Sequence, residues 1–213
     1  GQNGGDNNVV YQIVGQPLGV FYLPHCKGLV KNENGSYFYD IEDLDHNGKV
    51  DLSDGGDRYI AGQATPKVIL GSNISFRYKN YYISIQMNGA FGHKIFNGTG
   101  LAYTSMACFP DYNVLKDAPK KNIIDQRVSD YWLEKGDYLN FEHLTIGYNV
   151  PLRSKLIRSL RVSCNISNIG TITGYKGLTP MINSYVVNST MGIDDKRNYP
   201  LYRTYSLGLS VQF

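Results

Sequence analysis

No run of apolar residues in this 213-residue chain approaches the roughly 20 that a transmembrane helix needs. The protein is therefore either soluble or meets lipid through a sheet, whose alternating signal is weaker in each segment. The net charge is only +3 and no basic stretch is clustered, so nucleic-acid binding has no electrostatic support. Three cysteines, Cys26, Cys108 and Cys164, are too few and too widely spaced for a disulfide framework or a zinc pattern.

Motifs of catalysis are also missing. The chain contains no GxSxG, HExxH, P-loop or dinucleotide-binding fingerprint. His25 stands beside Cys26, but adjacent residues of an extended strand point to opposite faces, which favours a loop histidine and an inert thiol. We therefore predict that the protein is not an enzyme. No signal peptide is recognisable, so for an exported protein we expect the targeting segment to be lost or to lie on a longer precursor.

Aromatic residues and glycine are abundant instead. Eighteen tyrosines, eight phenylalanines and 23 glycines indicate strands joined by turns rather than helices. Five segments alternate apolar and polar residues with a period of two, the pattern of strands with two different faces. These segments cover residues 68–78, 81–91, 144–150, 160–167 and 201–213, and a weaker signal covers residues 9–22.

A two-residue turn at Lys79 and Asn80 joins the first two segments. Such a hairpin pairs its flanking residues and directs both to one face. Tyr78 and Tyr81 are these residues, and both belong to the apolar set of their strand. The register is thus consistent across the turn, and two tyrosines meet at one end of the apolar band, as in an interfacial aromatic girdle.

The length and chemistry of the strands suggest a membrane barrel. Strands of roughly 9–11 residues suit a tilted membrane strand, whereas globular strands are usually about 5–6 residues long. The faces opposite the apolar ones carry Ser, Asn, Thr, Gly and Gln, which suits a wet lumen, although a soluble sandwich also has alternating strands. Long polar stretches at 23–66, 92–138 and 170–200 contrast with short connections at 79–80 and 151–159, which is the asymmetry of outer-membrane barrels.

Ordered blocks along the chain resemble a known family. They include "GQPLGVFYLPHCKGLV" at 15–30, "YWLEKGDYLNFEHLTIGYNVPL" at 131–152, "RVSCNISNIGTITGYKGLTP" at 161–180 and "YPLYRTYSLGLSVQF" at 199–213. With the stretch 43–85, these blocks resemble the C-terminal part of the SusC/RagA family of TonB-dependent outer-membrane transporters. The resemblance covers nearly the whole chain and does not identify a substrate.

The resemblance implies an all-β fold, in which this chain supplies six or seven antiparallel C-terminal strands of a large outer-membrane β-barrel with long external loops. Residues 1–213 would then be the C-terminal part of the barrel, without the plug and the N-terminal strands. It further implies import of glycans or peptides, with a SusD-like surface lipoprotein, outer-membrane lipid, the remainder of the transporter chain, and TonB acting through the missing plug as partners. The terminal strand ending in Phe213 would be the signal read by the barrel assembly machinery, the alternative being an ordinary edge strand.

The stretch "DLDHNGKVDLSD" at 43–54 has the spacing of an EF-type calcium loop within an external loop. Ca²⁺ needs several converging oxygens, with a glycine at the sharp turn, here Gly48. The expected ligands, in loop order and with Lys49 contributing only its backbone carbonyl, are Asp43, Asp45, Asn47, Lys49, Asp51 and Asp54. Position twelve is normally a bidentate Glu, so the shorter Asp54 predicts weak binding, and an Asx-rich turn without an ion is the alternative.

Two questions stay open at this point. Five aromatic residues of the long stretches could stack on sugars, pack on a lipoprotein or simply pack within their loops: Tyr103, Phe109, Tyr112, Tyr131 and Trp132. A second hypothesis for the whole protein is a secreted or surface β-sandwich that binds glycan and is stabilised by calcium. It would explain the tyrosines, the strands and the Asp-rich loop.

Overall fold

The computed structural model describes residues 8–213 except 54, 124, 154–155, 183–190 and 197–198. The chain divides into two compact units. The sheet unit comprises Lys67–Phe91, Asp137–Gly174 and Pro200–Phe213, and the loop unit comprises Gly1–Pro66, Gly92–Gly136 and Tyr175–Tyr199. Each unit is therefore built from three separate segments.

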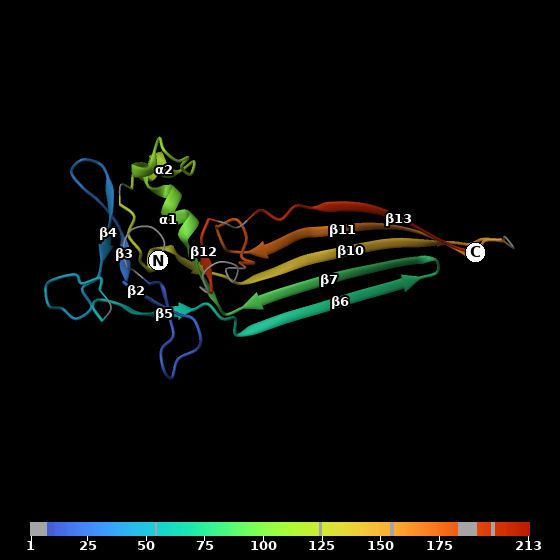
Figure 1. Cartoon of the computed structure of the whole chain (residues 1–213), viewed down its shortest axis with the longest axis horizontal. Helices are drawn as coiled ribbons and strands as arrows, with labels where there is room; N and C mark the ends of the chain where they lie inside the picture. The colour runs from blue at the N-terminus through green and yellow to red at the C-terminus, as the bar shows by residue number, and fades with distance from the viewer. Residues whose placement is uncertain (1–7, 54, 124, 154–155, 183–190, 197–198) are drawn as a thin grey trace. The chain divides into compact units, whose positions relative to one another are not determined.

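The sheet unit is one antiparallel sheet with strand order β13-β11-β10-β7-β6, as Figure 1 shows. Its strands are β6 (Val68–Tyr78), β7 (Tyr81–Phe91), β10 (Tyr138–Val150), β11 (Ser159–Thr173) and β13 (Thr204–Gln212). All five alternating segments are therefore confirmed as strands. Within the described residues, the sheet holds five of the six or seven strands that were expected.

Two of these strands are longer than the alternation indicated. β10 has 13 residues and begins at Tyr138, before the predicted start at Leu144. A β-bulge between Phe141 and His143 shifts the register there, so the alternation changes parity within the strand. β11 has 15 residues and continues to Thr173. Because of this change of parity, residues 138–141 of β10 do not continue the strict alternation of residues 144–150.

Much shorter strands build the loop unit. One sheet holds β1 (Val10–Tyr11), β2 (Val20–Leu23) and β5 (Tyr59–Gln63), and β3 (Cys26–Lys31) pairs with β4 (Tyr37–Ile41). A third sheet holds β8 (Lys94–Asn97), β9 (Leu133–Lys135) and β12 (Ile193–Asp194). The helical elements are α1 (Gly98–Thr104), α2 (Ala118–Lys121) and the 3-10 turns at Met106–Cys108 and Asp130–Trp132. The weak strand signal over 9–22 thus corresponds to two short strands separated by a turn.

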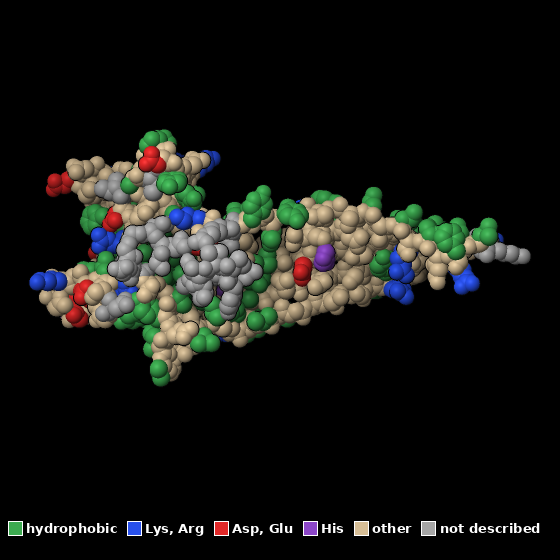
Figure 2. All heavy atoms as spheres, viewed as in Figure 1, with side chains coloured by type: hydrophobic (Ala, Val, Ile, Leu, Met, Phe, Trp, Pro, Cys, Tyr) green, Lys and Arg blue, Asp and Glu red, His purple; other side chains and the backbone are tan. Residues whose placement is uncertain are grey.

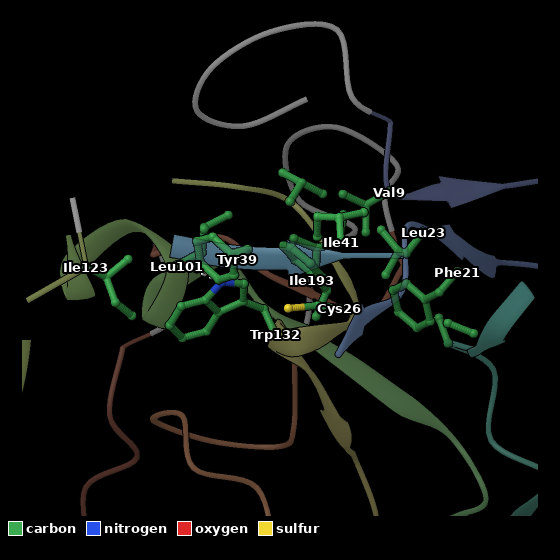
Figure 3. Packing of buried hydrophobic residues seen from close by; sticks show 14 residues of the cluster. Val9, Phe21, Leu23, Cys26, Tyr39, Ile41, Leu101, Ile123, Trp132 and Ile193 are labelled. Atoms are coloured by element: carbon green, nitrogen blue, oxygen red, sulfur yellow. Dashed lines mark hydrogen bonds between the residues drawn. The ribbon is translucent and has the colours of Figure 1, made fainter. Parts of the chain in front are cut away.

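The stretches that are long and polar in sequence, 23–66, 92–138 and 170–200, contribute residues to a hydrophobic core. Figure 3 shows residues from β2, β3, β4, α1 and β12 packed around Trp132, whose indole Nε1 donates a hydrogen bond to the Tyr39 hydroxyl at 3.1 Å. Phe21 and Leu23 are fully buried in this cluster, and Trp132 is 6% exposed. The expectation that these stretches are loops therefore needs a correction, since they fold together around a core of their own.

Among the described residues, no helix combines the length and the apolar character needed to cross a membrane.

Candidate functional site

The two faces of the five-stranded sheet differ in chemistry from edge to edge. Cross-strand pairing aligns one apolar row over all five strands: Phe76, Ile83, Ile146, Cys164 and Leu207. The adjacent row, on the opposite face, is polar throughout: Ser75, Ser84, Thr145, Asn165 and Ser206. Because successive residues of a strand point to opposite faces, the period-two pattern of the sequence becomes two continuous surfaces.

The apolar face of the sheet is exposed to an unusual degree. Ile74 is 55% exposed, Phe76 65%, Leu207 86% and Leu209 69%. A soluble protein rarely leaves a contiguous apolar surface of this extent uncovered. The row Leu207, Leu209 and Val211, which a sandwich would bury, has no covering layer within the described part of the sheet unit. Acyl chains are the surroundings that such a face suits.

The dimensions of the apolar face suit a bilayer. β6 has 11 residues, which corresponds to about 34 Å along the strand. At the roughly 40° tilt of outer-membrane strands, this length spans about 26 Å, close to the apolar band of about 25 Å in such barrels. At one end of this band, Tyr78 pairs with Tyr81 across the hairpin, and the Tyr81 ring centroid lies 4.7 Å from that of Tyr148. The predicted meeting of the two tyrosines is thus confirmed.

The opposite face holds a shallow polar pocket of about 380 Å³. Hydroxyl and amide side chains line it, together with one imidazole: Ser84, Gln86, His143, Thr145, Asn165, Ser167 and Ser206. Figure 2 shows this face as mainly neutral and polar, with an acidic and a histidine side chain near its centre. The Thr145 hydroxyl donates to the Asn165 side-chain oxygen at 2.9 Å, and Ser167 and His143 share a hydrogen bond of 3.1 Å. Such a surface exchanges hydrogen bonds with water or with a polar solute.

Glu142 is a residue of this face that sequence reasoning missed. The β-bulge at Phe141–His143 makes it the extra residue of β10, opposite no partner on β7. Its carboxylate accepts hydrogen bonds from the side-chain amides of Gln86 at 3.2 Å and Asn88 at 3.1 Å. The bulge thus brings a negative charge onto a face that is otherwise neutral over its central rows. The change of alternation parity between Phe141 and Leu144 was the signal that could have revealed it.

The predicted calcium loop brings together only part of the expected set. Ligand oxygens of Asp43, Asp45 and Asp57 lie within 4.8 Å of one another. Asp57 lies beyond position twelve of the motif and was not predicted, whereas Asp51 does not belong to this group. The Asn47 side-chain oxygen accepts the backbone N–H of Lys49 at 2.8 Å. Asp54 lies outside the described residues.

Asp57 also organises the loop through backbone hydrogen bonds. It is 1% exposed, and its carboxylate accepts the N–H groups of Asp51 at 2.7 Å, Leu44 at 2.6 Å and Asp45 at 3.3 Å. These bonds, the one from Asp51 foremost, hold the pKa of the Asp57 carboxyl below its ordinary value. Asp43 accepts the N–H groups of Asn47 and Gly48, as a carboxylate at the first position of a tight loop does. The loop is thus ordered by its carboxylates, and the three clustered ones fit a hard cation.

Aromatic residues of the long stretches separate into two groups. Trp132 is buried in the core of the loop unit, and Tyr131 packs against it with ring centroids 5.0 Å apart. Tyr103 is half-buried, with the Lys196 ammonium 5.9 Å from its ring centroid. Phe109 and Tyr112 are 59% and 65% exposed and are the two that remain accessible to a partner.

His25 and Cys26 both contact Asp130, through different carboxylate oxygens. His25 Nδ1 lies 2.6 Å from Asp130 Oδ2, and the Cys26 backbone N–H donates to Asp130 Oδ1 at 2.7 Å. The Cys26 thiol is buried, and this burial raises its pKa, which lowers its reactivity. The interpretation of an inert thiol agrees with this geometry.

No family model matches the chain, but individual relatives do. The chain is 27% identical to "TonB-dependent receptor P3" of Formosa agariphila over 93% of its own length and 22% of the relative's. It is 26% identical to "TonB-dependent receptor SusC" of Bacteroides thetaiotaomicron over 99% of its length and 21% of the relative's. The chain therefore spans about a fifth of the length of the curated relatives it matches.

Solved structures of similar fold agree with these relatives. A RagAB peptide importer in the "open-open" state matches 97% of this chain and 24% of its own, with a TM-score of 0.73 and 18% identity. A second structure, of the RagAB peptide transporter, matches with a TM-score of 0.70 and 16% identity, over 97% of this chain and 24% of its own. The fold is thus shared, and the resemblance to SusC/RagA-type TonB-dependent transporters is confirmed, as is the all-β class. The proteins that the chain resembles are named as receptors and importers, not as enzymes.

Proposed function

We propose that this SusC/RagA-like chain forms part of the wall of an outer-membrane nutrient importer driven by TonB. Its location is the bacterial outer membrane, as for the proteins it resembles. The observation that carries the proposal is the pairing of a continuous apolar face with a continuous polar face on one sheet. In a closed barrel the first face meets lipid and the second lines the lumen.

The substrate class that we propose is glycans or peptides. The polar face offers hydroxyl and amide groups with a single carboxylate at its centre, which can exchange hydrogen bonds with sugar hydroxyls and with peptide groups alike. The RagAB structures are named as a peptide importer, which makes peptides one of the two cases. The chain itself supplies a wall and external loops, and we assign no catalytic role to any of its residues.

The proposed partners are a SusD-like surface lipoprotein, the remainder of the transporter chain and TonB acting through a plug outside this sequence. The exposed Phe109 and Tyr112 of the loop unit are candidates for contact with the lipoprotein, because exposed aromatic side chains are enriched at protein interfaces. Alanine substitution of both is expected to weaken co-purification of the lipoprotein with the transporter. Unchanged co-purification would remove these two residues from the interface.

Accessibility to oxygen tests the two-faced wall directly. Nitroxide labels would be placed one at a time at Ser206, Leu207, Leu209 and Ser210 of β13, in the protein as the cell makes it and in a bilayer. Oxygen dissolves in acyl chains, so collision rates with oxygen should be high at Leu207 and Leu209 and low at the two serines. A water-soluble nickel chelate should fail to reach the two leucine positions. A flat profile, or maxima at the serines, would contradict the membrane wall.

A secreted β-sandwich that binds glycan is the competing hypothesis. It requires a second layer over the apolar face, whereas Leu207 is 86% exposed. It also predicts a protein that stays in aqueous solution without detergent. The oxygen profile would then be low at all four positions, so one experiment separates the two hypotheses.

We further propose that the loop at 43–54 binds Ca²⁺ weakly and stiffens an external loop. Asp43 and Asp45 would supply carboxylate oxygens, Asn47, Asp51 and Asp54 are the other side chains of the motif, and Lys49 would offer its carbonyl. We expect a Kd of roughly 10⁻⁴–10⁻³ M. Asp57 is an additional carboxylate close to the first two.

Calorimetry tests the ion. Calcium added to the protein should give binding heat that the double variant Asp43→Ala and Asp45→Ala loses. Asp111→Ala serves as the matched control, because this exposed carboxylate of the loop unit lies outside the clustered group. Heat equal to that of the double variant would identify the loop as an Asx-rich turn without an ion.

A further inference from the structure

Two short turns lie at one end of the sheet. Lys79 and Asn80 join β6 to β7, and residues 151–158 join β10 to β11. The Asn149 backbone N–H donates to the Asn80 carbonyl at 2.8 Å, so the two turns lie beside each other. The Arg158 N–H donates to the Gln212 carbonyl at 2.7 Å, which ties the second turn to the end of β13. We call the described residues of these turns, which are 79–80, 151–153 and 156–158, the short-turn rim.

The short-turn rim is positively charged. Lys79, Arg153 and Arg158 are exposed, and none of them forms an ion pair within the described residues. No aspartate or glutamate occurs in residues 67–91 or 143–174 of the sequence. Lys and Arg side chains gather at this end of the sheet in Figure 2. We call Lys79, Arg153 and Arg158 the rim cations. The turns that carry them and the adjoining strand ends contain no acidic side chain that could neutralise them.

The same rim exposes apolar side chains. Leu156 is 81% exposed and Leu152 is 37% exposed, although both belong to a turn outside the strands. Tyr78 and Tyr81 of the apolar face are 59% and 56% exposed at the adjoining strand ends. Exposed leucine beside arginine suits the boundary between headgroups and acyl chains, where apolar and cationic side chains both find favourable surroundings.

Lys79 links the positive charge to the lipid-facing side. Its Nζ lies 5.3 Å from the ring centroid of Tyr78, a residue of the apolar face. Arg161 behaves differently, because its Nε donates to Asn149 Oδ1 at 2.9 Å and its guanidinium lies over Tyr82, so it belongs to the polar face. Lys79 therefore lies on the side of the sheet that would face lipid, whereas Arg161 lies on the side that would face the lumen.

We propose that the short-turn rim binds anionic phospholipid headgroups of the membrane leaflet at this end of the sheet. The phosphodiester oxygens accept hydrogen bonds from the ammonium and guanidinium groups, while Leu152 and Leu156 enter the acyl boundary. A zwitterionic headgroup offers the same phosphate but no net charge, so each rim cation should favour an anionic lipid by about five-fold at moderate salt. The inference rests on the proposed function, because it requires the sheet to span a bilayer.

Lipid selection by the protein tests this inference. The protein as the cell makes it would be placed in nanodiscs containing three parts phosphatidylcholine and one part phosphatidylglycerol. After mild detergent extraction, mass spectrometry would measure the ratio of the two lipids that remain bound. We expect at least a five-fold enrichment of phosphatidylglycerol over the bilayer composition, which 1 M NaCl should abolish because the charges are exposed.

Three variants make the result specific. The neutral variant Lys79→Gln, Arg153→Gln, Arg158→Gln should lower the enrichment to less than two-fold. The charge-conserving variant Lys79→Arg, Arg153→Lys, Arg158→Lys should retain it. The control variant removes three exposed charges of the loop unit, by Lys31→Gln, Lys116→Gln and Lys120→Gln, and should behave as the wild type.

The outcomes separate the two proposals. Enrichment that persists in the neutral variant, or that falls equally in the control variant, overturns the rim as a headgroup site. Failure of the β13 labels to alternate in oxygen accessibility would instead refute the membrane wall itself. A protein that alternates in oxygen accessibility but shows no enrichment overturns only the rim.

Discussion

Substitution of Ile74 by arginine tests the physical basis of the fold most sharply. Ile74 lies near the middle of β6, is 55% exposed, and pairs with Ile85 on the apolar face. Ser75 is its neighbour on the polar face, where its hydroxyl donates to Ser84 Oγ at 3.0 Å. The two positions differ by one residue along the strand, so Ile74→Arg and Ser75→Arg place the same charge at the same depth on opposite faces.

The expected costs differ by kilocalories. An arginine that faces lipid near the bilayer midplane costs about 2–4 kcal/mol in a membrane barrel, which corresponds to a loss of about 30-fold to 900-fold in the folded-to-unfolded ratio. Ser75→Arg keeps its charge in water and loses one neutral hydrogen bond, about 1 kcal/mol. If Ile74 instead faced water, its replacement would change stability by no more than about 0.5 kcal/mol.

The measurement is denaturant unfolding of the protein in phospholipid vesicles, followed by the shift of the folded band on gels run without heating. The midpoint for Ile74→Arg should lie well below that of the wild type, with an unchanged slope. The midpoint for Ser75→Arg should lie close to that of the wild type. Equal midpoints, or a lower one for Ser75→Arg, would refute the assignment of the two faces.

Three further predictions concern packing and the acidic loop. Trp132→Ala should lower the unfolding free energy of the loop unit by about 3–5 kcal/mol. Trp132→Phe keeps part of the ring but loses the hydrogen bond to Tyr39 and some core volume, and should cost about 1–2 kcal/mol; hydrogen exchange of core amides measures both, and equal losses would contradict this account. Gly147→Ala should destabilise the sheet, because the new methyl would overlap the Tyr82 ring at Cε1, and Tyr82→Ala should relieve much of the loss in thermal melting of the double variant. The lowered pKa of Asp57 makes its stabilisation of the loop complete above its ordinary pKa of about 4 and lost as pH falls through the folded value. The protection of loop amides against hydrogen exchange, relative to the intrinsic rate at each pH, should therefore fall at acidic pH, and the same fall in Asp57→Asn would contradict this role.

Local periodicity was sufficient to predict the sheet from the sequence. Alternation depends only on neighbouring residues. The sequence was therefore sufficient to predict the strands that contain Ile74, Ile83, Ile146 and Leu207, and to predict which face of each strand is apolar. The turn at Lys79–Asn80 fixed the register of the first hairpin for the same reason. The membrane interpretation also came from local chemistry, since the polar faces lack the charges of a water-exposed sandwich.

Contacts between distant segments were decided by the tertiary structure alone. The core around Trp132 collects Phe21, Tyr39, Leu101 and Ile193 from four separate stretches, each too short and too polar in its surroundings to suggest burial by itself. Pairwise contacts across such distances leave no period in the sequence.

The same holds for the residues that tertiary structure added to the two sites. Asp57 joins Asp43 and Asp45 because the chain turns back after the motif, and Glu142 reaches the polar face because a bulge interrupts β10. Both features depend on how backbone donors and cross-strand partners are satisfied in space. The sequence thus determined which face of each strand is apolar, whereas the tertiary structure determined which side chains from distant segments come into contact.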